Sequence, residues 1–203
     1  MSTPKNRVPI DFLKQNIFYD SVAEILIWKE NHLKSPQWNA RYSNKKVGFH
    51  KSDKGYHYIK INYNGKRYII AEHRVIWALS KNQWPEHTID HIDNNKSNNK
   101  MKNLRSATVA ENNKNKPSTK NSTSKYKGIT WKSKENKWYV AVRVYGKSKH
   151  LGIFYDEVDA AIAYNQAAKK YHGDFAYINI IDGYTNKAYP NMPRHWAPEE
   201  IAA

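Results

Sequence analysis

The stretch "TIDHIDNNKSNNKMKNL", residues 88–104, decides the fold of the first part of the chain. Residues 88–92 are predicted to form a brief strand, the asparagine-rich segment after them a loop, and residues 103–107 a second strand. Thr108 and Glu111 then form a capping-box pattern, so a helix is expected to begin at residue 109. The order is therefore strand, strand, helix, which predicts a small α+β unit.

Four side chains of this region suit the hydrolysis of a phosphodiester: Asp90, His91, Asn103 and Asn112. Histidine can take a proton from water because its unperturbed pKa lies near 6.5. Carboxylate and amide oxygens are the hard ligands that Mg²⁺ prefers. Neighbours in an extended strand point to opposite faces, so Asp90 and His91 can address a metal and a water from different directions. Two strands packed on a helix would gather all four side chains in one pocket.

A calcium loop beginning at Asp93 is the rival interpretation of the same stretch. It fails because Asn98 stands where the tight turn needs glycine and Leu104 where a bidentate glutamate is needed. Asp93 is expected either to shape the turn or to support the residues that bind metal, rather than to be a ligand itself, and Glu111 is explained by the capping box. The remaining loop asparagines are expected to shape a solvated turn; they are Asn94, Asn95, Asn98 and Asn99.

The segment "HRVIWAL…IDHIDNNKSNNKMKNLRSATVAENNKN" resembles the HNH endonucleases with the ββα-metal fold, particularly those of phage and intron homing systems. The resemblance extends over roughly residues 15–116. It implies that Asp90 and Asn112 bind a divalent metal, that His91 is the general base, and that Asn103 orients the His91 ring. His73 matches a histidine of the family's upstream helix, but a core or hydrogen-bonded role explains it as well, and it stays outside the catalytic set.

The composition predicts a polyanionic partner. The 203 residues include 34 Lys and Arg against 18 Asp and Glu, a formal net charge of +16, which is the footprint of a nucleic-acid binder. No basic amphipathic helix or apolar span indicates a membrane, and no signal peptide is apparent. The absence of cysteine excludes disulfides and thiolate zinc sites. We expect a soluble protein of the cytoplasm, that of the host cell if the chain is phage-encoded.

Further elements are predicted on both sides of this stretch. Two short strands are expected at residues 16–20 and 24–29, a hairpin around Asn64-Gly65 over residues 56–70, and a short helix over residues 73–81 with Ile76, Trp77 and Leu79 inward. The expected domains are a polar N-terminal segment (1–15), the HNH domain (16–116), a linker (117–123), a second module (124–179) and a tail (180–203).

Residues 124–179 are predicted to form three antiparallel strands followed by one helix. They resemble the plant ethylene-response-factor, or Apetala-two, DNA-binding domain, with "YKGI", "VRV", "LGIF", "AAIAYNQAA" and "HGDFAYIN" as the matching motifs. The resemblance implies DNA contacts by Lys127, Arg143 and His150. Thr130, Ala141 and Ser148 replace charged contacts of the plant proteins, so the plant target sequence does not carry over.

Together these patterns predict a two-module α+β protein: a ββα-metal nuclease module preceded by hairpins, then a three-stranded sheet packed on a helix. The expected activity is hydrolysis of double-stranded DNA with Mg²⁺, or alternatively Mn²⁺. The expected state is a monomer that nicks one strand. The alternative is a non-catalytic, sequence-specific DNA-binding regulator that uses the nuclease fold as a scaffold.

Overall fold

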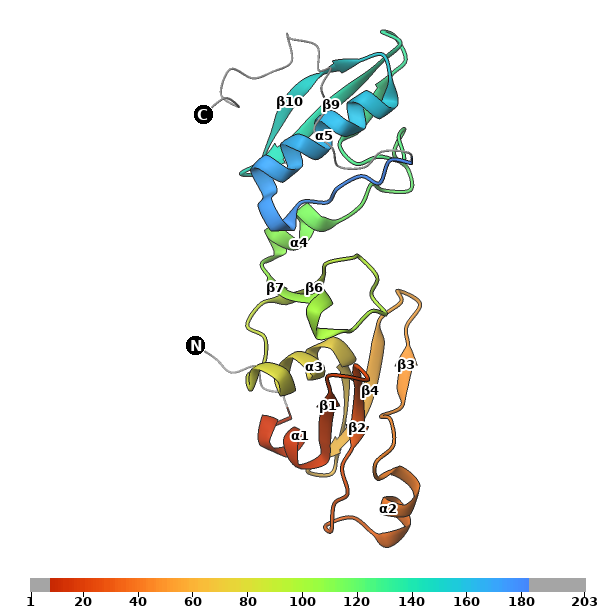
Figure 1. Ribbon diagram of the computed structural model, residues 1–203, viewed down its shortest axis with the longest axis vertical. Coiled ribbons are helices and arrows are strands. Elements are labelled where there is room, and N and C mark those ends of the chain that lie inside the picture. The colour runs from red at the N-terminus through yellow and green to blue at the C-terminus, as the bar shows by residue number, and fades with distance from the viewer. Residues whose placement is uncertain (1–7, 183–203) are drawn as a thin grey trace. The chain divides into compact units, whose positions relative to one another are not determined.

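The computed structural model describes residues 8–182, which form two compact units (Figure 1). The first unit ends at Asn112 and the second begins at Asn113. This division lies inside the helix that follows the opening stretch, before the expected linker at residues 117–123. Each unit buries a hydrophobic core of its own. Among residues 8–182, no helix is both long and apolar enough to cross a membrane.

The first unit begins with a helix that sequence analysis missed. Helix α1 (Ile10–Asn16) lies in the segment expected to be polar and featureless, yet Leu13 on it is fully buried. The helix packs against α3, so burial of its apolar face stabilises it despite the polar residues around it. The two expected strands follow as the antiparallel pair β1 (Ile17–Asp20) and β2 (Ile25–Trp28).

A three-stranded antiparallel sheet with the order β3-β4-β5 forms the middle of this unit. The predicted hairpin is confirmed: β4 and β5 are joined at Asn64 and Gly65, whose φ angles of 47° and 71° fit a tight primed turn. No element was predicted for α2, although Ser35 caps it and a proline opens it. The bounds are α2 Pro36–Tyr42, β3 Phe49–Lys51, β4 His57–Tyr63 and β5 Lys66–Ala71.

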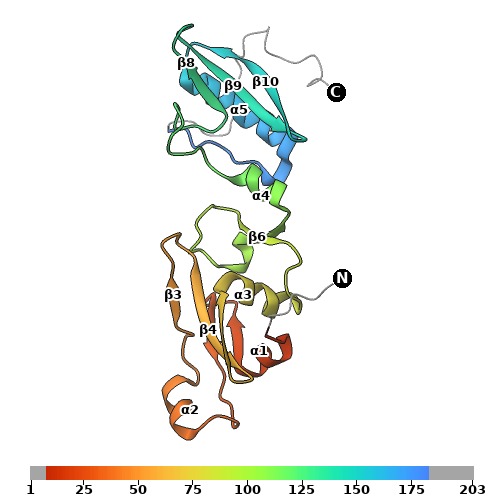
Figure 2. The same ribbon diagram turned by 180° about the vertical axis from the view of Figure 1, so that it is seen from behind.

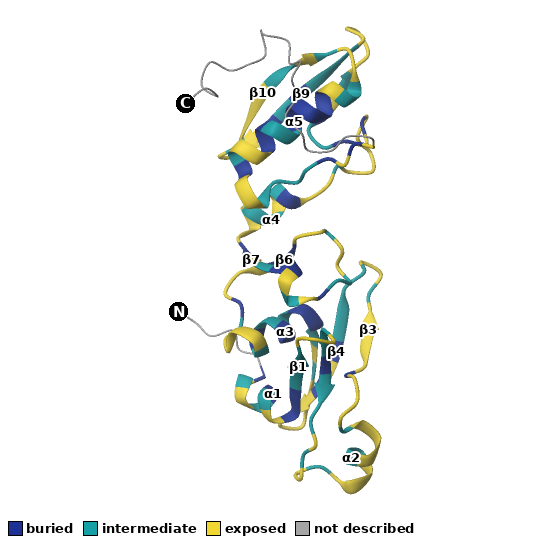
Figure 3. Cartoon of the chain, viewed as in Figure 1, coloured by how far each residue is buried: buried dark blue, intermediate teal, exposed yellow. Residues whose placement is uncertain are grey.

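Helix α3 (Glu72–Lys81) lies beside β1 and β4 and ends at Asn82, which has the left-handed φ of 54°. The expected inward face is confirmed: Ile76 is buried, and Trp77 and Leu79 pack partly buried against the same core. The dark blue stretch of α3 in Figure 3 marks this buried face.

The opening stretch forms the elements expected of it. Strands β6 (Thr88–His91) and β7 (Leu104–Ala107) pair antiparallel, and the loop between them contains the 3₁₀ turn η1 (Met101–Asn103). Helix α4 (Val109–Asn115) follows, and its capping box is confirmed: the Thr108 amide donates to Glu111 Oε2 at 2.8 Å, and the Glu111 amide donates to Thr108 Oγ1 at 3.2 Å.

The second unit is a three-stranded antiparallel sheet, ordered β10-β9-β8, with one long helix packed on it (Figure 2). Val140 and Val142, two positions apart on β9, both face α5 and are buried. Small residues of the helix, such as Ala160 and Ala161, are buried as well. Of the expected tail, residues 183–203 lie outside the described part. The bounds are β8 Ile129–Lys132, β9 Lys137–Val144, β10 Lys147–Phe154, α5 Glu157–His172 and η2 Gly173–Phe175.

Candidate active site

Strand β6 carries two buried polar residues, Asp90 and His91, each with 4% of its surface exposed. Their side chains contact different partners, as expected of neighbours in a strand. Asp90 lies opposite Arg105 in the ladder with β7, and His91 reaches the loop and α3. Buried ionisable groups are costly unless they are paired, so their partners define the site.

The Asp90 carboxylate is held by Arg105. The guanidinium donates to Asp90 Oδ2 from Nε at 2.9 Å and from Nη2 at 2.7 Å, and the side chains are 16% and 5% exposed for Arg105 and Asp90 respectively. Charge-assisted bonds of this kind are stronger than neutral ones. They fix the carboxylate on the hairpin that also carries His91.

The ring of His91 is held by Asn99. Asn99 Nδ2 lies 2.7 Å from Glu72 Oε2, and Asn99 Oδ1 lies 3.0 Å from His91 Nε2. The carboxylate of Glu72 can only accept, so the Asn99 amide must turn its NH₂ toward Glu72 and its oxygen toward His91. His91 Nε2 therefore donates to Asn99 Oδ1, which selects the tautomer with the proton on Nε2 whenever the ring is neutral.

Glu72 anchors this arrangement from the first turn of α3. Its Oε2 also accepts a hydrogen bond from His57 Nδ1 at 3.0 Å, and the Glu72 residue is only 6% exposed. Asn99, at 7% exposure, is thus a buried link between Glu72 and His91, and its expected place in a solvated turn is wrong. The loop folds inward at Asn99 because polar groups of three separate segments, on Glu72, Asn99 and His91, form hydrogen bonds with one another.

His73 and Tyr56 form an aromatic wall beside His91. The His73 ring lies 5.1 Å from the His91 ring, edge on, and Tyr56 lies 6.0 Å from His91. Nδ1 of His73 is buried, and no group within residues 8–182 forms a hydrogen bond with it. Burial, with smaller contributions from His91 and Arg74, lowers the pKa of His73 to about 3, so this ring is neutral at ordinary pH. Burial also raises the pKa of Tyr56.

Asn103 holds the loop that follows His91. Its Nδ2 donates to Asp93 Oδ1 and to the Asn98 carbonyl, both at 2.8 Å, and its Oδ1 accepts from the Asp93 amide at 3.1 Å. Burial alone would raise the pKa of Asp93, but the hydrogen bonds from Asn98, Asn103 and the Asn95 amide outweigh it and lower that pKa. Asp93 is therefore a turn residue, as expected. The predicted action of Asn103 on the His91 ring stays a prediction.

Asn112 lies in the first turns of α4, half-buried, and its amide donates to the Thr108 carbonyl at 2.9 Å. Among the described residues, no three His, Cys, Asp or Glu side chains cluster as metal ligands. The predicted pair does not depend on such a cluster, because Mg²⁺ takes few protein ligands and keeps several waters. A carboxylate and an amide oxygen are donors of the right kind for it.

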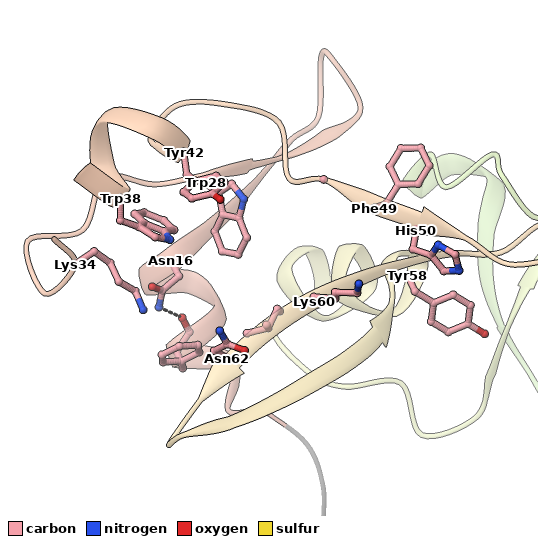
Figure 4. A pocket seen from close by; sticks show the side chains of 13 residues that line it. Asn16, Trp28, Lys34, Trp38, Tyr42, Phe49, His50, Tyr58, Lys60 and Asn62 are labelled. Carbon is pink, nitrogen blue, oxygen red and sulfur yellow. Dashed lines mark hydrogen bonds between the residues drawn. The ribbon is translucent and has the colours of Figure 1, made fainter. Parts of the chain in front are cut away.

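A half-open groove of about 550 Å³ lies elsewhere in the first unit, between α2, β2 and the outer side of β4 (Figure 4). Trp28, Trp38 and Tyr58 line it together with Lys34 and Lys60, and none of the predicted catalytic residues does. Phe49 also lines the groove, and its ring stacks on His57 at 3.9 Å. The groove therefore lies next to His57, the residue that donates a hydrogen bond to Glu72.

In the second unit, Arg143 and His150 are exposed on the side of the sheet away from α5. His172 Nε2 donates to the Arg143 carbonyl at 2.8 Å, which fixes the backbone there. Lys127 is placed differently: its ammonium donates to the carbonyls of Asn113 and Lys114, and burial lowers its pKa to about 8. Two of the three predicted DNA contacts thus share an exposed face, whereas Lys127 caps the end of α4.

Comparisons with known proteins match the region that contains the buried residues Asp90 and His91. Residues 71–114 match the model of the HNH endonuclease family. Protein 3.8 of Escherichia phage T7 is 31% identical over 105 residues, which are 51% of this chain and 86% of that protein. An uncharacterized HNH endonuclease, L560 of Acanthamoeba polyphaga mimivirus, is 38% identical over 94 residues, 46% of this chain and 48% of that protein.

A solved structure, described as DNA binding and cleavage by the HNH homing endonuclease I-HmuI, is 31% identical. The match covers 36% of this chain and 42% of that one, with a TM-score of 0.32. The chain thus spans about half or less of these last two relatives and most of the phage T7 protein. The matched region contains α3, the Asp90–His91 strand and most of α4, and this part of the chain is an HNH endonuclease domain.

Proposed function

We propose that this protein is a divalent-metal-dependent DNA endonuclease of the homing type, which hydrolyses phosphodiester bonds in double-stranded DNA. The observation that carries the proposal is the buried His91 ring, held at Nε2 by Asn99 Oδ1 at 3.0 Å. A neutral imidazole fixed in this way keeps the Nδ1 lone pair for a proton, which is what a general base needs.

In the proposed reaction, His91 takes a proton from the water that attacks phosphorus. Asp90 and Asn112 would hold a divalent ion, Mg²⁺ or Mn²⁺, which when bound stabilises charge on a nonbridging oxygen and on the leaving 3′ oxygen. Arg105 keeps the Asp90 carboxylate in place through its two bonds to Oδ2. The products carry 5′-phosphate and 3′-hydroxyl ends.

One such set of residues holds the chemistry for one strand, so the monomer nicks DNA. The formal charge of +16 supplies affinity for phosphates, and that affinity falls as salt rises. We propose that residues 124–179 form an Apetala-two-like recognition module. Arg143 and His150 reach DNA from the exposed sheet face, since strands can enter the major groove and arginine can read guanine there.

Plasmid nicking tests the proposal. Supercoiled DNA with candidate sites is incubated with the full chain and Mg²⁺ or Mn²⁺, beside His91→Ala and the matched variant His87→Ala, whose histidine is exposed on the segment before β6. We expect open circles from the wild type and from His87→Ala, and rates about 10² to 10⁴ lower from His91→Ala. If the wild type retards DNA on a gel but never nicks it with any metal, the regulator interpretation replaces the nuclease.

A further inference from the structure

We propose that Asn99 and Glu72 are positioning residues for the catalytic base: together they select the Nε2–H tautomer of His91 and aim its Nδ1 lone pair. This inference rests on the proposed function, because it names residues that serve the same site. Neither residue belongs to the set predicted from the sequence, and Asn99 was expected in solvent.

The first step of the argument is the direction of the hydrogen bonds. Glu72 Oε2 lies 2.7 Å from Asn99 Nδ2 and 3.0 Å from His57 Nδ1. A carboxylate oxygen accepts from both, so the Asn99 amide cannot flip without placing its own oxygen against that carboxylate. The orientation of Asn99 is therefore fixed by Glu72, and the orientation of Asn99 decides which ring nitrogen of His91 is protonated.

The second step is burial. Glu72, Asn99 and His91 are 6%, 7% and 4% exposed. Water therefore offers little alternative to these bonds, and a flipped amide would leave buried groups unsatisfied at a cost of about 1 to 3 kcal/mol. That penalty is large enough to keep one tautomer dominant over the other.

The third step is rigidity. The three side chains come from α3, from the β6–β7 loop and from β6, and the edge-on ring of His73 packs against His91 from α3 as well. At the other end, Phe49 stacks on His57, which limits the movement of the second donor to Glu72. The loop residue Asn99 is thus held between two regular elements, and such fixed positioning is what a general base requires, because small displacements reduce the rate strongly.

The test compares Asn99→Leu and Glu72→Leu with Glu72→Gln. Leucine is close in size to both residues and removes the polar contact. Glutamine keeps a carbonyl oxygen that can accept from Asn99 and from His57, so it is the conservative control. We expect kcat for nicking to fall about 10- to 100-fold in both leucine variants, with KM for DNA little changed, and to be restored largely in Glu72→Gln.

The tautomer itself is measured by ¹⁵N NMR of the histidine rings in the full chain, without metal. The protein has nine histidines, and the His91 signals are identified by their loss in His91→Gln. We expect one Nε2–H form in the wild type and in Glu72→Gln, and a mixture of both tautomers in the leucine variants.

The two measurements separate the inference from the proposed function. If the wild type never nicks DNA, the function fails, while the NMR result still decides the inference. An Nδ1–H ring for His91 in the wild type overturns the inference even if a leucine variant fails to fold. It is equally overturned if a folded leucine variant retains both the single tautomer and the wild-type kcat, or if Glu72→Gln behaves like Glu72→Leu.

Discussion

Asp90 and Arg105 face each other across the β6–β7 ladder, and two bonds from the guanidinium, 2.9 and 2.7 Å long, meet on one oxygen, Oδ2. The pair joins Asp90, the residue predicted to bind metal, to Arg105 on the neighbouring strand β7. Both side chains are largely buried, so water cannot readily replace either partner. Removing one of them would leave the other as an unpaired buried charge, which is costly. The hairpin thus carries its own counter-charge for the carboxylate.

Arg105→Met is expected to lower the free energy of unfolding by about 3 to 5 kcal/mol, because it leaves the buried Asp90 carboxylate without its partner. Urea denaturation followed by tryptophan fluorescence measures this change. Arg105→Lys keeps the positive charge but lacks the paired N–H donors of the guanidinium, so the free energy of unfolding should fall by less than in Arg105→Met. Equal denaturation midpoints for the wild type and Arg105→Met would show that the pair contributes nothing to stability.

Removal of metal should abolish nicking without unfolding the protein. We expect EDTA to stop the reaction, and added Mg²⁺ or Mn²⁺ to restore it. Asn112→Ala should raise the metal concentration for half-maximal nicking by at least about tenfold, because it deletes a proposed ligand. The matched control is Asn113→Ala, the exposed neighbour whose Oδ1 accepts from Lys116 at 2.6 Å. The same metal dependence in both variants would remove Asn112 from the site.

His73 is expected to make stability fall in mild acid. The unfolded chain binds a proton on this residue below about pH 6.5, whereas the folded protein keeps the ring neutral down to about pH 3. Its contribution is therefore complete above the unfolded pKa and is lost as the pH falls. Between pH 7 and pH 5 the loss amounts to about 2 kcal/mol.

His73→Phe tests this contribution, since phenylalanine fills a similar space and cannot titrate. Urea unfolding of wild type and variant is measured at several pH values. The difference between their unfolding free energies should shift in favour of the variant by about 2 kcal/mol from pH 7 to pH 5. Parallel curves would mean that the pKa of His73 is the same in the folded and unfolded states.

Gly128 is expected to tolerate no side chain. Its φ is +80°, and an added Cβ would lie 2.1 Å from Cδ2 of the buried Tyr164 and 2.8 Å from the Ala141 carbonyl oxygen. Gly128→Ala should cost more than about 3 kcal/mol, from backbone strain and overpacking together. Gly146→Ala has the same φ of +80°, but its added Cβ would meet no atom of the described residues within 4 Å, so it isolates the strain and should cost about 1 kcal/mol. Thermal unfolding of the second unit compares them, and equal losses would contradict the clash.

Arg143→Ala should weaken binding to duplex DNA and lower the salt slope of the logarithm of affinity by about 1 if the guanidinium contacts phosphate. Fluorescence anisotropy over a range of salt concentrations measures this slope. The matched control is Lys169→Ala, an exposed cation on α5 rather than on the sheet. An identical effect of the two substitutions would remove the special role of the sheet face.

Elements with strong local signals were predicted closely. Asn64-Gly65 specifies a hairpin through backbone conformations that few residues adopt, and Thr108 with Glu111 specifies the start of α4 by satisfying free amides. Helix α2 was not predicted, although Ser35 followed by Pro36 is a typical helix start. Helix α1 had none of comparable strength, because its stability comes from packing on α3.

The order of strand, strand and helix could be predicted from the sequence, as could the Asp90–His91 pair and the basic character of the chain, because each depends on neighbouring residues or on composition. Tertiary structure alone decided how His91 is held. Glu72, His57 and Asn99 lie on segments separated along the chain, and no spacing predicts that they meet. They meet because buried polar groups must be paired, and folding brings these donors and acceptors to the same place.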